Sequence, residues 1–277
     1  MTLAETLRRS TDYLRGKGVP SPRVDAEHLL AHALALTRIQ LYTEHDRPLR
    51  EAELERLRGL LRRRGRREPL AYVLGEWGFR RLTLAVDRRA LVPRPETEIV
   101  VERCLALLAG ERAPRVLDVG VGTGAIALAI SDECPDARVT GVDTSRDALE
   151  LARENARRTG LAVELRQGGF EVAAEDWDLV VANPPYVSPQ EYETLQPEVR
   201  EWEPRAALVG EGRHEELARL ARTRWLVLEV GDGQAPEVAE ELRELGYADV
   251  RISPDLAGVE RVVEGRRDYA TRPRIVA

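Results

Sequence analysis

Four consecutive residues, Asn183, Pro184, Pro185 and Tyr186, combine a side-chain amide, two rings without a backbone N–H and an aromatic hydroxyl. They follow the apolar run Val180 to Ala182, which is typical of a buried strand. The planar nitrogen of an amide or an aromatic amine is a poor nucleophile because its lone pair is delocalised. If the Asn183 side-chain oxygen and the Pro184 carbonyl accept its two hydrogens, the lone pair is held facing an electrophile.

The prolines and the tyrosine suit the same task. Prolines keep the backbone rigid and remove N–H donors that would compete for the two acceptors. Tyr186 offers a flat surface and a hydroxyl to a planar group. We therefore predict Asn183, Pro184 and Tyr186 as catalytic residues and Asn183 to Tyr186, including Pro185, as the substrate-binding loop. The alternative interpretation is a strand that two prolines terminate.

A glycine-rich loop precedes this stretch in the sequence "LDVGVGTGAIALAI". Gly120, Gly122 and Gly124 follow an apolar strand pattern and lead into a helix pattern, which places them at the carboxyl end of a strand, where open parallel sheets bind ligands. Ala125 stands where a dinucleotide fingerprint has its last glycine, which argues against a bound pyrophosphate.

The acidic residue that follows the loop limits the class of ligand that the site can bind. Asp143 ends the next strand pattern, where a carboxylate accepts hydrogen bonds from both hydroxyls of a ribose. A nucleoside cofactor without a diphosphate fits, and S-adenosylmethionine is such a cofactor, with a sulfonium that nearby carboxylates favour. NAD enzymes share the same outline, and a structural turn with Asp143 as a helix cap is a further alternative.

From Arg115 onward, strand and helix patterns alternate, which predicts an α/β fold with a parallel sheet covered on both faces. The last two strands are joined without a helix, so the sheet is expected to end in an antiparallel hairpin. The predicted strands are "RVLDVG", "RVTGVD", "AVELR", "WDLVVA", "WLVLEV", "ADVRIS" and "ERVVEG".

The first seventy residues predict a small helical bundle. Thr2 and Glu5 form a capping box, and leucines recur at helical spacing in three segments. The third segment ends in the arginine run, defined as Arg62, Arg63, Arg64, Arg66 and Arg67. This run is interpreted either as a binding patch for RNA or an acidic protein, or as a solvated helix end whose positive charge suits the helix dipole.

The bulk composition limits the classes of protein. A chain of 277 residues suits one large domain and a small one, because single cores usually split above about 250 residues. The net charge of −6 argues against a large nonspecific nucleic-acid footprint. Cys104 and Cys134 lack metal-ligand spacing, and we predict no metal site. No apolar stretch reaches the roughly 18 residues that a membrane span needs, and no signal-peptide pattern is present, so we expect a cytoplasmic protein.

With both motifs in place, the chain closely resembles the HemK/PrmC family of release-factor glutamine methyltransferases. Four further stretches carry the resemblance over most of residues 20 to 265: "EPLAYVLGEWGF", "LVPRPETE", "WEPRAAL" and "LVLEVGDGQ". The resemblance implies a seven-stranded class I S-adenosylmethionine-dependent methyltransferase (Rossmann-like) domain over 93–277. It further implies a small N-terminal helical bundle over 1–75 for substrate recognition and a linking β-hairpin over 76–92.

The resemblance also implies the reaction and its residues. The methyl group of S-adenosylmethionine goes to the side-chain amide nitrogen of glutamine in the Gly-Gly-Gln tripeptide of class I peptide chain release factors. Arg94, Glu96 and Glu98 are expected at the pocket edge, or else they fix the proline-rich linker. No membrane or nucleic acid is required, and we expect a monomer. The cofactor-binding residues are Gly120, Val121, Gly122, Thr123, Gly124, Asp143, Phe170 and Asn183.

The chain departs from the family pattern after the third predicted strand. Family members usually carry an acid and an aromatic residue there that clamp the adenine, whereas this chain has Gly168 and Gly169, with Phe170 left to stack. A second departure is a shortened helix before "WLVLEV". Two rival functions stay open. One is a DNA or RNA amino-methyltransferase acting on adenine N6 or guanine N2, supported by the arginine run, and the other is a nucleotide-binding or scaffold protein without enzymatic activity.

Overall fold

The computed structural model describes residues 1–267; residues 268–277, the end of the predicted 93–277 domain, lie outside the described part. The chain forms two compact units. The helical unit comprises Met1–Glu76 and also Leu195–Trp202, a segment from far along the sequence. The sheet unit comprises Trp77–Thr194 and the chain from Glu203 onward.

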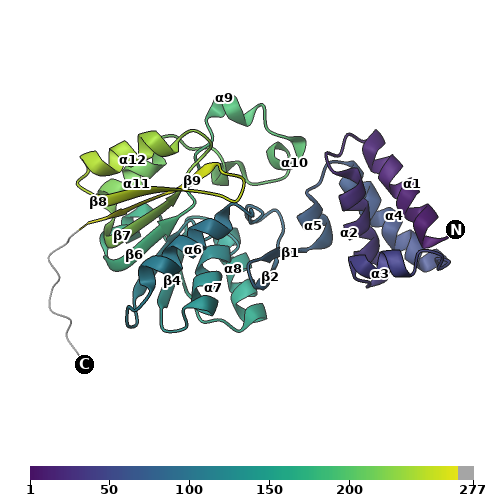
Figure 1. Cartoon of the computed structure of the whole chain (residues 1–277), viewed down its shortest axis with the longest axis horizontal. Coiled ribbons are helices and arrows are strands. Elements are labelled where there is room, and N and C mark those ends of the chain that lie inside the picture. The colour runs from purple at the N-terminus through teal and green to yellow at the C-terminus, as the bar shows by residue number, and fades with distance from the viewer. Residues whose placement is uncertain (268–277) are drawn as a thin grey trace. The chain divides into compact units, whose positions relative to one another are not determined.

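The helical unit contains α1 to α5, labelled in Figure 1, and the short α10. Its core is formed by leucines that recur at helical spacing. The capping box of Thr2 and Glu5 begins the first helix as predicted. Leu3, Leu14, Leu29, Leu30 and Leu41 are fully or almost fully buried in this core. The helices are α1 (Leu3–Gly16), α2 (Pro22–Leu34), α3 (Arg38–Thr43), α4 (Glu51–Gly65), α5 (Leu70–Leu74) and α10 (Pro197–Arg200).

Much of the arginine run is used inside the helical unit. Arg64 is 5% exposed and binds Asp25 at 2.6 Å and Glu198 at 2.8 Å. Arg67 also binds Glu198, with both distances at 2.6 Å. Arg63 binds Glu68 and two backbone carbonyls. These arginines therefore hold α2, α4 and the Leu195–Trp202 segment together.

The sheet unit begins with a two-stranded sheet of β1 (Glu76–Phe79) and β2 (Leu82–Ala85). The main sheet has seven strands in the order β5-β4-β3-β6-β7-β9-β8. The first five are parallel, and β9 runs antiparallel to both β7 and β8. The strands are β3 (Arg115–Val119), β4 (Arg138–Asp143), β5 (Glu164–Gln167), β6 (Asp176–Ala182), β7 (Arg222–Glu229), β8 (Ala248–Pro254) and β9 (Glu260–Arg266).

Helices cover both faces of this sheet because its central strands are apolar on both sides. On one face α6 (Thr97–Leu108), α7 (Ala125–Glu133) and α8 (Arg146–Thr159) pack in one hydrophobic cluster with the strands. On the other, α11 (Arg213–Leu220), α12 (Ala235–Glu244) and η1 (Phe170–Ala174) pack in a second cluster. The α/β class and the seven-stranded sheet predicted from the sequence are confirmed.

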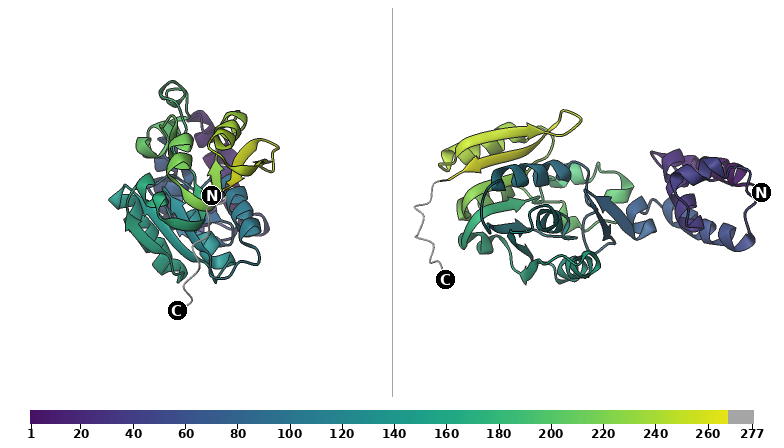
Figure 2. Two further views of the ribbon diagram at one scale, coloured as in Figure 1. Left: turned by 90° about the vertical axis from the view of Figure 1, so that its left-hand side faces the viewer. Right: turned by 60° about the horizontal axis from the view of Figure 1, so that its bottom comes forward.

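The edges of the sheet also follow the prediction. The β8–β9 hairpin, yellow in Figure 2, forms the antiparallel end. The strand predicted to start at Trp225 already begins at Arg222, directly after the short α11. Three short helical turns, α9 (Pro189–Tyr192), α10 and η2 (Arg205–Ala207), occupy the chain between β6 and α11.

Candidate active site

The two motifs singled out from the sequence meet at the carboxyl ends of neighbouring strands. Val119 at the end of β3 is in register with Ala182 at the end of β6, and with Val142 of β4 on its other side. The glycine loop and Asn183 therefore start side by side, at the edge where parallel sheets bind ligands. A cavity of about 590 Å³ opens there and is lined entirely by residues of the sheet unit.

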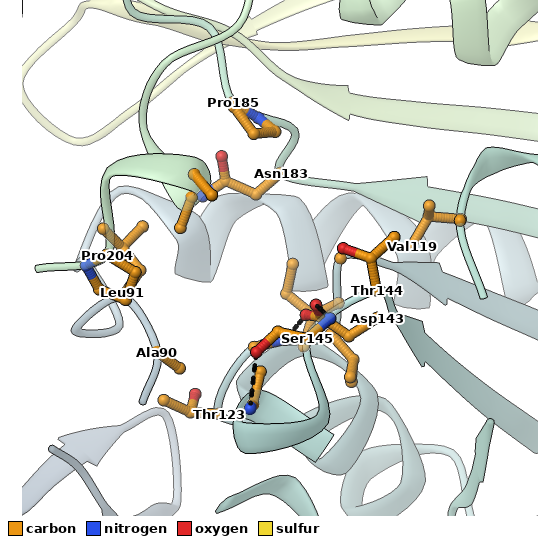
Figure 3. A pocket seen from close by; sticks show the side chains of 18 of the residues that line it. Ala90, Leu91, Val119, Thr123, Asp143, Thr144, Ser145, Asn183, Pro185 and Pro204 are labelled. Carbon is orange, nitrogen blue, oxygen red and sulfur yellow. Dashed lines mark hydrogen bonds between the residues drawn. The ribbon is translucent and has the colours of Figure 1, made fainter. Parts of the chain in front are cut away.

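Figure 3 shows Asn183 and Pro185, Asp143 and Ser145, and Leu91 and Pro204 around this cavity. Its volume lies in the range of about 300–1,000 Å³ that is typical of small-molecule sites. Of the predicted cofactor residues, the cavity is lined by Gly120, Val121, Gly122, Thr123, Asp143, Phe170 and Asn183. Gly124, at the end of the loop, does not line the cavity.

The loop's glycines are required by its backbone. Gly120, Gly122 and Gly124 have φ values of 79°, 53° and 87°, a region that side chains with a Cβ rarely adopt. The loop is held against Asp143, whose Oδ2 accepts the Gly122 N–H at 3.0 Å. Its Oδ1 accepts the Ser145 N–H at 2.9 Å (dashed in Figure 3). Each carboxylate oxygen keeps a further lone pair for a ligand hydroxyl.

A buried asparagine that the sequence analysis missed fixes the other side of the loop. Asn155 of α8 is completely buried, and its Nδ2 donates to the carbonyls of Thr123 and Ala85 at 2.9 and 3.0 Å. Its Oδ1 accepts the Ala85 N–H at 2.7 Å. One amide therefore ties the glycine loop to the end of β2. The sequence signal that could have identified Asn155 is a polar residue within the otherwise apolar buried stripe of α8.

The structure also supplies an acid where the sequence analysis expected none. Glu171 follows Phe170 in η1, lines the cavity, and accepts the Gly169 N–H at 2.7 Å. This backbone hydrogen bond holds the pKa of Glu171 below its usual range. The wall that was expected to hold only Phe170 thus contains an aromatic ring with a carboxylate beside it. The glutamate directly after Phe170 was its sequence signal.

Asn183 extends from the end of β6 into the cavity wall. Its Nδ2 donates to Thr97 Oγ1 at 3.5 Å. No residue of the described range 1–267 donates a hydrogen bond to Asn183 Oδ1 or to the carbonyl of the buried Pro184. Pro185 lines the cavity, whereas Pro184 is buried and is not among the lining residues.

Tyr186 points into a second, smaller cavity of about 160 Å³. The residues around this cavity are Arg94, Glu96, Tyr186, Glu229 and Arg261. The Tyr186 ring stacks on His214 with centroids 6.3 Å apart. Burial and the nearby Glu229 raise the pKa of Tyr186 to about 12, so its hydroxyl keeps its proton. The structure therefore brings Asn183 and Pro185 to the large cavity and turns Tyr186 toward the small one.

The loop is held in place after Tyr186. Val187 and Val209 form a bridge in which the Val187 N–H donates to Leu208 O at 2.9 Å and Gly210 N–H donates to Val187 O at 3.1 Å. A Cβ at Gly210 would lie 2.7 Å from the Pro185 carbonyl oxygen, so only glycine fits here. This contact fixes the backbone conformation of the segment that contains Pro184 and Pro185.

The three charged residues of the "LVPRPETE" stretch separate in space. Arg94 lines both cavities and binds Glu203 at 2.6 Å. Glu203 is buried, which raises its pKa against the opposing effect of Arg94. Glu96 lines the smaller cavity. Glu98 lines neither, and accepts the Arg80 N–H at 2.9 Å, so its contact fixes the β1–β2 turn.

The larger cavity fits a cationic nucleoside. It offers loop backbone that a ligand can approach closely, a strand-end carboxylate at Asp143 and an aromatic ring next to Glu171. Carboxylates in the wall favour a positively charged ligand such as a sulfonium. This fold and this site define a class I methyltransferase that uses S-adenosylmethionine.

Comparison with known proteins gives the family. Residues 5–75 match the family described as the PrmC N-terminal domain, and residues 97–201 match the methyltransferase small domain. A release factor glutamine methyltransferase from Geobacter sulfurreducens is 42% identical over 276 residues, 94% of this chain and 96% of the relative. Another from Deinococcus radiodurans is 41% identical over 278 residues, 96% of this chain and 99% of the relative. The chain belongs to the release factor glutamine methyltransferase family.

Solved structures show the same fold. The hMettl16 catalytic domain in complex with a 3′UTR hairpin has a TM-score of 0.55 at 15% identity, and the match covers 69% of this chain and 77% of that one. The delta-N METTL16 methyltransferase domain has a TM-score of 0.50 at 16% identity, with 67% of this chain and 88% of that one covered. Within residues 1–267, no helix has the length and apolar character to cross a bilayer.

Proposed function

We propose that this enzyme methylates the side-chain amide nitrogen of the glutamine in the Gly-Gly-Gln tripeptide of class I peptide chain release factors. One observation carries the proposal. Asn183 lies beside the glycine loop on neighbouring strands, and both of its predicted acceptors, Asn183 Oδ1 and the Pro184 carbonyl, are without a donor among the described residues. Two acceptors on one loop match the two hydrogens of a primary amide.

The cofactor side of the site divides into three contacts. The glycine loop, Gly120 to Gly124, gives close backbone approach, Asp143 accepts from the ribose, and Phe170 with Glu171 receives the base. When bound, S-adenosylmethionine supplies an electrophilic methyl group.

Asn183 and Pro184 act on the nucleophile. By accepting both N–H hydrogens they fix the amide plane and turn the nitrogen lone pair toward the cavity. Such positioning contributes up to about 7–11 kcal/mol in well-oriented intramolecular reactions. As the nitrogen acquires its fourth bond it becomes acidic, and the proton that it loses is one of the two hydrogen-bonded to Asn183 Oδ1 and the Pro184 carbonyl, from which it passes to water. No strong base is therefore required at the outset, and Tyr186, which keeps its proton, is assigned to holding the loop.

The helical unit is assigned to gripping the release factor outside the tripeptide. Its arginine run is largely engaged with Asp25, Glu68 and Glu198, which removes the main support for a nucleic-acid substrate. We further propose a monomeric, cytoplasmic enzyme that needs neither a membrane nor a nucleic acid.

The test is methyl transfer from radiolabelled S-adenosylmethionine, offered in parallel to four substrates. These are a purified class I release factor, its Gly-Gly-Ala variant, bulk DNA and bulk RNA. Label on the intact factor alone supports the proposal. Label on DNA or RNA overturns the substrate, and equal labelling of the Gly-Gly-Ala variant overturns the target residue.

A further inference from the structure

The proposed function requires the Asn183 amide to face one way. Its oxygen, Oδ1, must point at the substrate. An amide turned by 180° fills almost the same space, but its nitrogen then points at the substrate instead. A nitrogen there would present hydrogens to the hydrogens of the substrate amide. Something in the protein must therefore distinguish the two orientations, and packing alone does not.

Thr97, the first residue of α6, lies on the far side of this amide. It is 5% exposed, and its Oγ1 accepts the hydrogen of Asn183 Nδ2 at 3.5 Å. A hydroxyl has one hydrogen to donate and lone pairs to accept with. If that hydrogen is donated to another group, the hydroxyl presents only lone pairs to Asn183. Lone pairs attract the N–H of the Asn183 amide and repel its oxygen, so Nδ2 rather than Oδ1 faces Thr97.

Glu229, at the end of β7, is the acceptor that we assign to that hydrogen. Against the effect of burial, which raises the pKa of the Glu229 carboxyl, the Thr97 hydroxyl lowers it as a side-chain hydrogen-bond donor does, and a carboxylate can only accept. Glu229 is 2% exposed, and its other oxygen, Oε2, has no partner among the described residues. The carboxylate is thus committed to Thr97 and buried just behind the catalytic loop.

We propose that Thr97 and Glu229 are positioning residues that set the orientation of the Asn183 amide. The chain of hydrogen bonds runs from Asn183 Nδ2 to Thr97 Oγ1 and from the Thr97 hydroxyl to Glu229. It holds Asn183 Oδ1 toward the substrate nitrogen. This inference rests on the proposed role of Asn183 and extends it to two residues from other elements, α6 and β7.

The charged and titratable groups around Glu229 come from the segment that leads into α6, the loop after β6, β9 and α11. Arg94 precedes α6, Glu96 caps it, Tyr186 follows β6 and Arg261 lies on β9. His214 of α11 contacts the backbone carbonyl of Glu229 through Nε2 at 2.8 Å. Burial raises the pKa of Glu229 to about 7, an effect that Thr97 opposes and Glu96 reinforces. Protonated Glu229 would no longer oblige the Thr97 hydroxyl to donate to it.

A double-mutant cycle tests the proposal. T97V keeps the shape and removes the hydroxyl, T97S keeps the hydroxyl, and N183A removes the amide. The turnover number kcat on the intact release factor and the Kd for S-adenosylmethionine are measured for each variant and for T97V/N183A. We expect T97V to lower kcat about tenfold with the cofactor Kd within threefold, and T97S to recover most of that loss.

The cycle separates the two hypotheses. In the N183A background T97V should change kcat less than twofold, because the amide it orients is gone. An equal loss from T97V in both backgrounds, or no loss in either, overturns the orienting role of Thr97. If N183A itself leaves kcat unchanged, the proposed role of Asn183 fails.

The part played by Glu229 has its own measurement. The ratio of wild-type kcat to that of E229Q is compared between pH 6 and pH 8, which cancels the titration of groups common to both. The ratio should rise severalfold with pH, because only the wild-type carboxylate ionises over this range. A ratio that stays constant overturns the assignment of Glu229.

Discussion

The two units bury carboxylates in opposite ways. In the helical unit, Glu27 receives hydrogen bonds from Arg23, Arg38 and Tyr42 at 2.7, 2.6 and 2.5 Å. Burial alone would raise the pKa of Glu27, but these three donors lower it to about 2. In the sheet unit, burial raises the pKa of Asp118 to about 7, although the Ala127 N–H opposes it.

Glu229 behaves like Asp118. Each has one oxygen without a partner among the described residues, Asp118 Oδ1 and Glu229 Oε2. Both sit at or near the carboxyl end of a parallel strand, and Glu229 lines the smaller cavity. Not every acid of the sheet unit is like this, since Glu264 is fully buried and paired with Arg103.

The contrast separates two uses of buried charge. A buried carboxylate whose oxygens all accept hydrogen bonds contributes to the stability of the fold. A buried carboxylate with an oxygen that accepts none lowers stability, and such groups are found where the chemistry of a site requires them. We infer that polar burial in the helical unit serves the fold and that at these strand ends it serves the site. Four substitutions test this difference.

The largest effect is expected from R64A in the helical unit. It leaves Asp25 and Glu198 without the guanidinium that both bind. Breaking a buried pair costs about 3–5 kcal/mol because a charge is left uncompensated. Chemical denaturation followed by circular dichroism measures it, with R66A, an exposed member of the same run, as control. Similar losses in the two variants would show that Arg64 is not structural.

N183A should leave the stability of the fold unchanged and strongly lower the turnover number kcat. We expect kcat to fall by roughly 10²–10³, as when one preorganised hydrogen-bonding group is lost from an active site. The Kd for S-adenosylmethionine should change less. Steady-state kinetics and calorimetric titration measure the two, and Q190A, an exposed change in the following turn, is the control. Equal loss of both quantities would mean that Asn183 mainly builds the cofactor pocket.

D118N should stabilise the protein at high pH. The raised pKa of Asp118 means that its folded state favours the proton. The wild type therefore loses stability as pH rises from about 4 through about 7, by about 4 kcal/mol in total. The asparagine carries no charge, so D118N should unfold at a higher denaturant concentration than wild type at pH 8.5 and not at pH 5. The same difference at both pH values would contradict the assigned pKa.

E27Q should have the smallest effect and the opposite sign. The lowered pKa of Glu27 gives the wild type stability that is fully present above about pH 4.5 and is lost as pH falls toward 2. We expect E27Q to cost about 2 kcal/mol at pH 7 and progressively less below pH 4.5. Denaturation at pH 7 and pH 4 measures this, and E51Q, which removes an exposed partner of Arg58, is the control. If E27Q lowered the free energy of unfolding by the same amount at pH 4 and at pH 7, the proposed difference between the buried carboxylates of the two units would be wrong.

The sequence predicted the strands and the two motifs because strand hydrophobicity, glycine spacing and Asn-Pro-Pro-Tyr are local signals. It did not predict that Leu195–Trp202 joins the helical unit, since that depends on Glu198 meeting Arg64 and Arg67. Two side-chain placements were also beyond it. Glu171 reaches the cavity through the η1 turn, and Tyr186 turns toward His214, and both outcomes depend on packing between distant elements.

The measurement that tests the account most directly is the position of the transferred methyl group. A class I release factor is incubated with the enzyme and S-adenosylmethionine, digested, and sequenced by tandem mass spectrometry. The account predicts the mass of one methyl group on the side chain of the Gly-Gly-Gln glutamine, and none when N183A replaces the wild type under the same short reaction. A methyl group on another residue, or the same yield from N183A, would contradict it.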